Sequence, residues 1–357
     1  MARRFLQYGI GLIELMISIT LGLIIVAVVI QVYVSSKSTF RMQAALSGLQ
    51  ENGRLAASYL SQDIRMAGYM GCPFIDEFGS PSPKIPFAPV VAFPQADLSF
   101  DANNIIRGFD TVSGGTSIYG TAASAMNANG GVVTNTDVLV VREAMNQSYS
   151  LQTNMTTKSA DITLSAPLSG INNGDYLVIS DCQHADLFML SSGSGTSTIK
   201  HTTPANSTAN LSTSYQANSA QVYGFQIITY FVGYTNRTTA GGNPIYALFV
   251  RKSTGSRVTT DELIEGVRDM QLSFGLDTNA DGYADSYVAA SGVASWSQVV
   301  SVQVNLLLVS DDDNVVTTNG GVKQSLTFNG NAIPSDNRLR QVFTATVAIR
   351  NRAEHRF

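Results

Sequence analysis

The chain has 357 residues, with 22 lysines and arginines against 26 aspartates and glutamates and a formal charge of −4. This slightly acidic balance excludes the large basic surface that a nucleic-acid-binding protein needs. Charged residues make up only 13% of the chain and 30 residues are glycine, a composition that favours an exported, β-rich protein over a helical cytoplasmic one.

The first strong pattern lies near the N-terminus. Residues 15–34 carry almost only apolar side chains, and twenty helical residues at about 1.5 Å each cross the hydrocarbon core of a bilayer. Arg3 and Arg4 precede this run, and no acid occurs among the first nine residues. The positive-inside bias therefore predicts that Met1 lies in the cytoplasm and that everything after residue 34 is exported.

A junction that resembles a cleavage site precedes the apolar run instead of following it. Gly9 and Ile10 follow the basic leader, and the lone acid Glu14 stands at the fifth position after the glycine. This order resembles the class III leader of type IV prepilins and pseudopilins, which a membrane peptidase cuts after the glycine before it methylates the new N-terminus. The usual first residue there is Phe, whereas this chain has Ile10. The resemblance implies that residues 1–9 are a cleaved leader.

Glu14 is an acid in a membrane helix, where a charged carboxylate costs about 2.5 to 3.5 kcal/mol at the bilayer centre. In one interpretation the side chain reaches the headgroups and meets the positive end of the helix dipole. In the other, Glu14 pairs during assembly with the new amine of Ile10 on a neighbouring subunit. Charge alone does not decide between them, and the prepilin-like pattern favours the second.

The helical pattern continues beyond the membrane segment. Apolar or small residues recur at spacings of three and four, at Leu46, Leu49, Gly53, Ala56, Leu60, Ile64 and Ala67. This spacing predicts one helix over residues 10–71, with a membrane-spanning first half and an amphipathic second half that must be covered. Gly68, Gly71 and Pro73 end it. Asn52 and Gly53 are poor helix formers, which allows a bend there.

Beyond Cys72 the hydrophobic period changes to two, which indicates strands. The expected strands cover residues 137–142, 161–164, 176–180, 187–190, 222–234, 246–251, 270–274, 299–309 and 342–350. Two stretches rich in Gly, Ser and Thr, residues 111–136 and 191–220, are expected to be surface loops. The predicted fold is therefore α+β, a long N-terminal helix packed on a large antiparallel β-sheet head of residues 72–357.

Cys72 and Cys182 are the two cysteines of the chain. In an oxidising compartment they are expected to form a disulfide that ties the helix end to the strand near residues 176–182. It closes a loop of about 110 residues, for which the chain-entropy model gives roughly 4 to 5 kcal/mol. The alternative is two buried free thiols.

Residues 277–285, DTNADGYAD, have the spacing of metal ligands. Oxygen ligands fall at the first, third, fifth, seventh and ninth positions of a calcium loop, at Asp277, Asn279, Asp281, Tyr283 and Asp285. The acid expected at the twelfth position is missing, so a shortened extracellular calcium loop is the favoured interpretation. Three carboxylates within nine residues repel one another without a cation. The alternative is an acidic hairpin turn, in which Asp, Asn and Gly are the usual residues.

Catalytic chemistry has little support in the sequence. The three histidines show no zinc spacing, and no glycine-rich loop suits a phosphate. Cys182 and His184 share one face of a strand as a nucleophile and its base would, but no third group orients them. We expect no enzymatic activity.

Five further stretches narrow the resemblance to the PilW family of type IV pilus minor pilins. They are residues 50–72 (QENGRLAASYLSQDIRMAGYMGC), 179–188 (ISDCQHADLF), 263–277 (LIEGVRDMQLSFGLD), 296–310 (WSQVVSVQVNLLLVS) and 340–352 (RQVFTATVAIRNR). The resemblance implies a low-abundance subunit that primes pilus assembly and supports twitching motility and adhesion. It implies an inner-membrane stage with prepilin peptidase, then a place at the pilus tip with other minor pilins, the major pilin and a tip adhesin.

Two rival functions remain open. A minor pseudopilin of type II secretion shares the leader, the helix and a β-rich head, although the two cysteines and the length favour the pilin. A signal-anchored periplasmic enzyme or receptor is the rival from another class. It would keep the first nine residues and stay in the membrane, so the mass of the mature N-terminus separates it from both pilin-like candidates.

Overall fold

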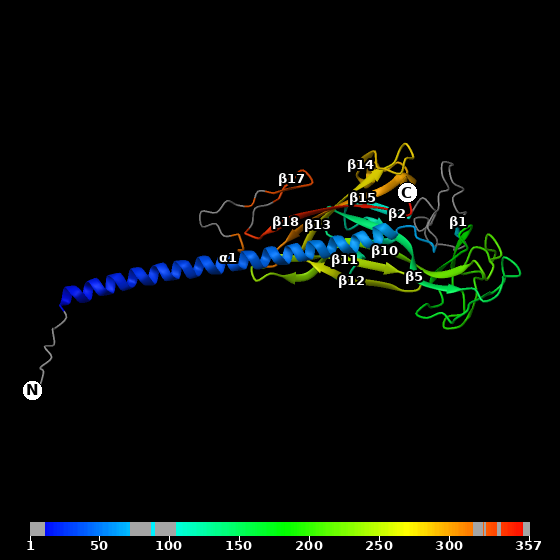
Figure 1. Cartoon of the computed structure of the whole chain (residues 1–357), viewed down its shortest axis with the longest axis horizontal. Helices are drawn as coiled ribbons and strands as arrows, with labels where there is room; N and C mark the ends of the chain where they lie inside the picture. Colours follow the sequence, from blue (N-terminus) through cyan, green and yellow to red (C-terminus); the bar gives the residue numbers. More distant parts are fainter. Residues whose placement is uncertain are drawn as a thin grey trace, which may run out of the picture.

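The computed structural model describes residues 11–71, 87–89, 105–316, 324, 326–333 and 337–352. One long helix, α1 (Leu12–Met66), extends from a β-rich head, and only its C-terminal half lies along that head (Figure 1). Long antiparallel strands form most of the head. The α+β class and the helix-on-sheet architecture expected from the sequence are therefore confirmed.

Two sheets build the head. The larger has eight strands: β1 (Phe87–Pro89), β2 (Ile106–Val112), β5 (Thr136–Ser150), β7 (Tyr176–Ser180), β8 (Ala185–Met189), β10 (Gln221–Thr238), β11 (Pro244–Ser253) and β12 (Val258–Glu265). All its pairs are antiparallel except β1 with β8. The smaller is antiparallel in the order β14 (Ser286–Val288), β13 (Val267–Leu276), β15 (Val299–Val309), β18 (Arg340–Ala348).

Short elements complete the described chain. Three two-stranded ladders pair β3 (Ser117–Ile118) with β4 (Thr121–Ala122), β6 (Ile162–Thr163) with β9 (Thr198–Ile199), and β16 (Thr327–Phe328) with β17 (Asn331–Ala332). Single 3₁₀ turns are η2 (Ala123–Ala125), η3 (Ala290–Gly292) and η4 (Trp296–Gln298). The two stretches expected to be loops, 111–136 and 191–220, are mostly irregular and contain only the ends of longer strands, short strands and one such turn.

The main hydrophobic core joins α1 to both sheets. Buried side chains from the helix, such as Leu60 and Ile64, belong to the same cluster as Val140 of the large sheet and Val304 of the small one. Asp137 connects the sheets, because its carboxylate accepts the N–H of Thr111 at 2.9 Å and that of Leu272 at 2.8 Å. Burial raises the pKa of Asp137 to about 6, against the lowering effect of these bonds. A second, smaller core lies under the lobe of residues 149–222.

Three details differ from the sequence predictions. The helix spans Leu12–Met66, shorter than the expected 10–71, and Leu46 on the expected buried stripe is 38% exposed, whereas its neighbour Ala45 packs against the core. The helix also runs through Gly53 without interruption. Strands β2, β12 and β14 were not expected, since β12 carries mostly exposed side chains and therefore lacks a hydrophobic alternation.

Candidate functional site: the N-terminal helix and its contacts

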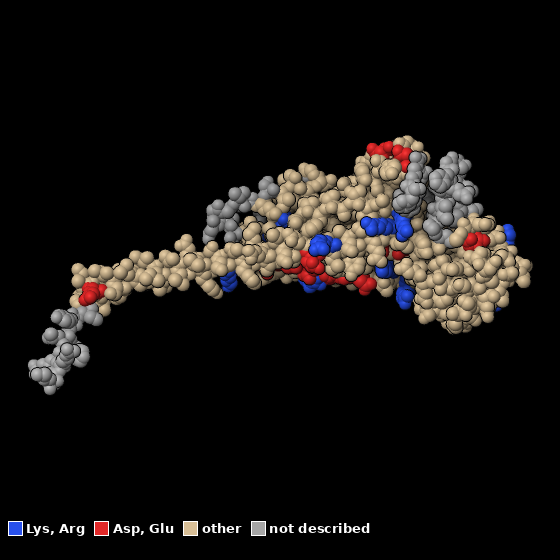
Figure 2. All heavy atoms as spheres, viewed as in Figure 1, with Lys and Arg blue, Asp and Glu red and all other residues tan. Residues whose placement is uncertain are grey.

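The first half of α1 is an apolar rod without contacts to the head. The helix is long and apolar enough to cross a membrane, and the window that meets this test is fully exposed. Figure 2 shows this part of the helix nearly free of charged side chains, apart from acidic atoms near its N-terminal end. A rod of exposed Leu, Ile and Val side chains in water is costly, so this segment needs a lipid or protein environment.

Glu14 lies in the first turn of this helix and is exposed. Its backbone oxygen accepts a hydrogen bond from the hydroxyl of Ser18 at 2.7 Å, and the N–H groups of Glu14 and Leu15 both donate to Gly11. Gly9 and Ile10, the expected processing site, lie outside the described residues. The placement of Glu14 at the positive end of the helix dipole suits both interpretations of this acid.

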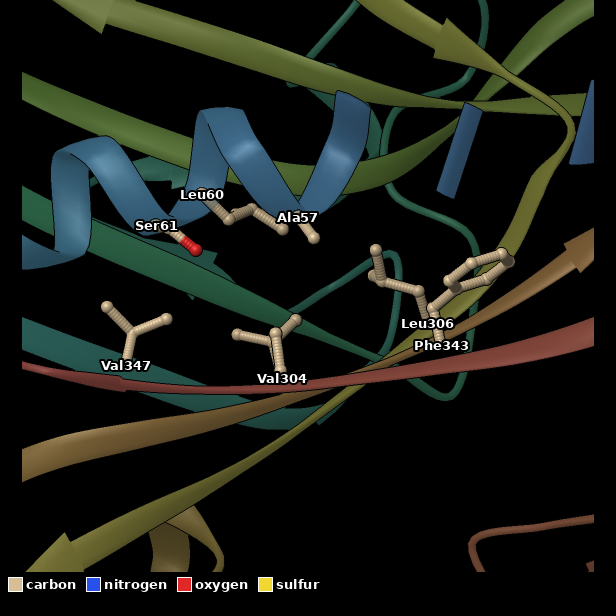
Figure 3. A pocket seen from close by; sticks show the side chains of 8 residues that line it. Ala57, Leu60, Ser61, Val304, Leu306, Phe343 and Val347 are labelled. Carbon is tan, nitrogen blue, oxygen red and sulfur yellow. The ribbon is translucent and has the colours of Figure 1, made fainter. Parts of the chain in front are cut away.

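The second half of α1 is fixed to the head by close packing. An added Cβ on Gly53 would lie 2.4 Å from the ring of Phe343 on β18, so only glycine allows this approach. The Asn52 side chain donates to the backbone oxygen of Glu265 on β12 at 3.1 Å. Figure 3 shows Val304, Leu306, Phe343 and Val347 pointing from β15 and β18 toward Ala57, Leu60 and Ser61 of the helix. The residues that are poor helix formers therefore serve docking within an uninterrupted helix.

Polar groups at the end of α1 form a buried cluster with the large sheet. The hydroxyl of Tyr230 donates to Asp63 at 2.6 Å, and the Gln226 amide donates to Glu143 at 3.0 Å. Glu143 is 7% exposed, and its Oε2 atom has no hydrogen-bond partner among the described residues. Burial, followed by the charge of Asp63, raises the pKa of Glu143 to about 7.

The pKa of Asp63 is also raised, chiefly by burial, although the Tyr230 hydroxyl and the charge of Lys252 lower it. The cluster thus holds two neighbouring carboxylates whose negative charges repel each other, and the charge of Lys252 lowers the pKa of both. Sequence reasoning missed it, because residues 63, 143 and 230 lie far apart and none belongs to a motif. Only the polar residue Asp63, next to the apolar stripe of the helix, gave any signal.

The chain after the helix is held beside β10. The hydroxyl of Tyr223 donates to the backbone oxygen of Gly71 at 3.2 Å, and the rings of Tyr69 and Tyr223 meet edge to face at 6.2 Å. Tyr223 pairs with Val178 of β7, the strand that leads to Cys182. The helix end therefore lies next to the strand that the disulfide prediction named.

Cys182 lies in the turn between β7 and β8, where its φ is +68°, and it is disulfide-bonded. Cys72 lies outside the described residues, so the pairing of the two stays a prediction. Asp181 closes the turn by accepting the backbone N–H of Gln183 at 2.9 Å and that of His184 at 2.6 Å. Cys182 thus does not share a strand face with His184, which corrects the alternation assumed for a nucleophile and its base.

The loop of Asp277 to Asp285 connects β13 to β14. The carboxylate of Asp277 accepts the N–H of Asp281 at 3.2 Å and that of Gly282 at 2.8 Å. The amide nitrogen of Asn279 lies 3.2 Å from oxygens of both Asp281 and Asp285. Hydrogen bonds from Thr278 lower the pKa of Asp285.

These bonds give the loop the form of a hairpin turn held by its own acids. The side chain of Tyr283 is 72% exposed and its N–H donates to Asp281 at 2.8 Å. In the described part of the chain, no three His, Cys, Asp or Glu side chains are grouped so that they could hold a metal ion. Both interpretations of the loop contain these turns, so calcium binding stays a prediction.

A family comparison bears on the C-terminal part of the head. Residues 229–351 match the model of the family described as type IV pilus-assembly protein W, PilW. This range contains two of the five stretches that carried the resemblance and nearly all of a third; residues 50–72 and 179–188 lie outside it. No curated protein and no solved structure matches the chain. The match and the exposed apolar helix support placing the chain in a family related to type IV pili, with a part in pilus assembly.

Proposed function

We propose that the chain is a minor pilin that primes assembly of type IV pili and is incorporated at the pilus tip. The match of residues 229–351 to the PilW model carries this proposal. The exposed apolar half of α1 supports it, because a segment that first spans the inner membrane can later be buried among the helices of a filament. Twitching motility and adhesion would follow from the presence of complete pili.

Processing and recruitment are assigned to the N-terminal residues. Prepilin peptidase would cut between Gly9 and Ile10, and Glu14 would meet the new amine of a neighbouring subunit. Its position in the first turn of α1 suits this role, since the side chain is exposed and no described cation pairs with it. The other partners would be further minor pilins, the major pilin and a tip adhesin, with no nucleic acid and no enzymatic reaction.

A deletion strain tests the proposal. Loss of the chain should reduce surface pili and twitching, and the wild-type chain supplied in trans should restore both. Gly9→Val should leave an uncut precursor in the inner membrane that does not restore them. Glu14→Ala should be inserted and cut, yet be recruited poorly. A deletion strain with normal pili would contradict the proposal.

The alternative is a minor pseudopilin of type II secretion. The same deletion strain separates the two, because loss of a pseudopilin would stop secretion of folded exoproteins and leave pili intact.

A further inference from the structure

One edge of the small sheet presents unpaired backbone groups. Ile349 donates to the backbone oxygen of Val300 and Ser310 donates to that of Leu339, both at 2.8 Å. In an antiparallel ladder of constant register, the odd-numbered residues of β18 therefore bond to β15. The even-numbered residues Val342, Thr344, Thr346 and Ala348 turn their N–H and C=O groups outward. Among the described strands, β15 alone pairs with β18.

Both ends of this edge already have strand-like partners. The Gln324 side-chain amide donates to the backbone oxygen of Arg340 at 2.6 Å and accepts its N–H at 2.9 Å, which are the two bonds that a residue of an added strand would make. At the other end, the N–H of Arg350 donates to the backbone oxygen of Arg65 at 3.2 Å. The open stretch between them covers residues 342–348, about 20 Å, the length of an average strand.

The edge of the large sheet next to α1 is protected in a way that the edge of β18 is not. Strand β12 carries Asp261, Glu262 and Glu265, and its last carbonyl is bonded to Asn52 of the helix. Charged residues on an edge strand are a common defence against pairing with another chain. Strand β18 carries no charged side chain from residue 341 to its end at Ala348. Its edge therefore lacks this defence.

The surroundings of the open edge indicate the kind of strand that fits. On the side of β18 that faces α1, Phe343 and Ala345 are half-buried, and Ala57 and Ser61 line the same small apolar hollow between helix and sheet. Three exposed arginines lie along this edge: Arg65 and Arg350 are joined by a backbone hydrogen bond at one end, and Arg54 follows Gly53, which packs on Phe343 near the other. None of them forms an ion pair with a described acid. Figure 2 shows basic side chains on the face where α1 runs beside β18.

We propose that the open edge of β18 receives an extended segment of a neighbouring pilus subunit as an added strand. The segment is uncharged in its middle and carries acidic residues at its ends, where Arg54, Arg65 and Arg350 lie. Backbone hydrogen bonds to the open edge supply the contact. The identity of the partner as a pilus subunit rests on the proposed function, whereas the edge and its charge do not.

A proline at an outward-facing position tests the added strand, because it removes one outward N–H and leaves the bonds to β15 in place. Thr346→Pro is expected to unfold at the same temperature as the wild-type full chain in detergent, and to be incorporated into sheared pili at least tenfold less. The matched control is Val258→Pro, which removes an outward N–H from the edge of β12 and should be incorporated normally.

A charge variant tests the chemistry of the partner and does not depend on a proline. Arg350→Glu should reduce incorporation at least threefold, and Arg350→Lys should not. Normal incorporation of Thr346→Pro and Arg350→Glu would overturn the proposal, even where the deletion strain shows that the chain is needed for pili. If the purified wild-type chain forms a dimer that Thr346→Pro abolishes, the occupant is a second copy, and the assignment to another subunit is wrong.

Discussion

The buried acid cluster makes the attachment of the helix to the head dependent on pH. Glu143→Gln removes a charge that is 7% exposed and faces the charge of Asp63, while the amide oxygen still accepts the bond from Gln226. The pKa of Glu143 lies at about 7 in the folded chain, against an ordinary value near 4.5. At 1.36 kcal/mol per pKa unit, the ionised form costs the folded chain about 3 kcal/mol.

The raised pKa of Glu143 sets the direction in which stability changes with pH. The contribution of protonated Glu143 to stability is present at pH 4.5 and is lost as the pH rises through 7. The Glu143→Gln variant lacks this loss. Thermal unfolding of the full chain in detergent, followed by near-UV circular dichroism, should show the variant gaining roughly 4 to 6 °C over the wild type between pH 4.5 and pH 8. The control is Glu51→Gln, which changes an exposed acid of α1. Its melting temperature should change with pH as that of the wild type does.

Parallel pH profiles of Glu143→Gln and the wild type would refute this reasoning. They would mean that water or Lys252 neutralises the cluster in the folded chain. Asp137 also has a raised pKa, so both proteins should lose some stability as the pH rises. Only the difference between them reports on Glu143.

Three further results are expected. Gly53→Val should destabilise the full chain by about 1 to 3 kcal/mol in thermal or denaturant unfolding, since its side chain meets the Phe343 ring, and Phe343→Ala should relieve much of the loss if the contact is the cause. Cys72 and Cys182 should resist alkylation until a reductant is added, and two thiols labelled without reductant would exclude their pairing. Millimolar calcium should raise the melting temperature, Asp281→Ala should remove the gain, and calorimetry without a calcium-dependent heat would leave the loop a hairpin turn.

The sequence predicted the parts of the fold that follow from local periodicity. The spacing of Leu49, Ala56, Leu60 and Ile64 gave the buried face of α1, and all four are at most 3% exposed. Strand 299–309 was predicted at its true limits, because a long run of mostly Val and Leu residues marks both of its ends. Strand β12 was not expected, since its exposed acids and threonines show no alternation and only its pairing with β11 makes it a strand.

The contacts that position the helix depend on residues far apart in the chain. Gly53 was taken as a point of weakness, and its role became clear only when Phe343, 290 residues later, was found against it. Likewise, Asp63 and Glu143 approach each other only because the end of α1 crosses β5 and β10. The local pattern of one sequence does not show that such distant residues meet. The apolar run and the acid Glu14, in contrast, can be recognised from the sequence itself.

The central claim is that this chain becomes part of the pilus after its leader is removed. The most direct test is mass spectrometry of its N-terminal peptide, recovered from sheared and washed pili of cells that express the wild-type chain. We expect a peptide that begins at Ile10, present in the pilus fraction. A peptide that still begins at Met1, or a chain found only in the membrane fraction while pili are plentiful, would contradict the account.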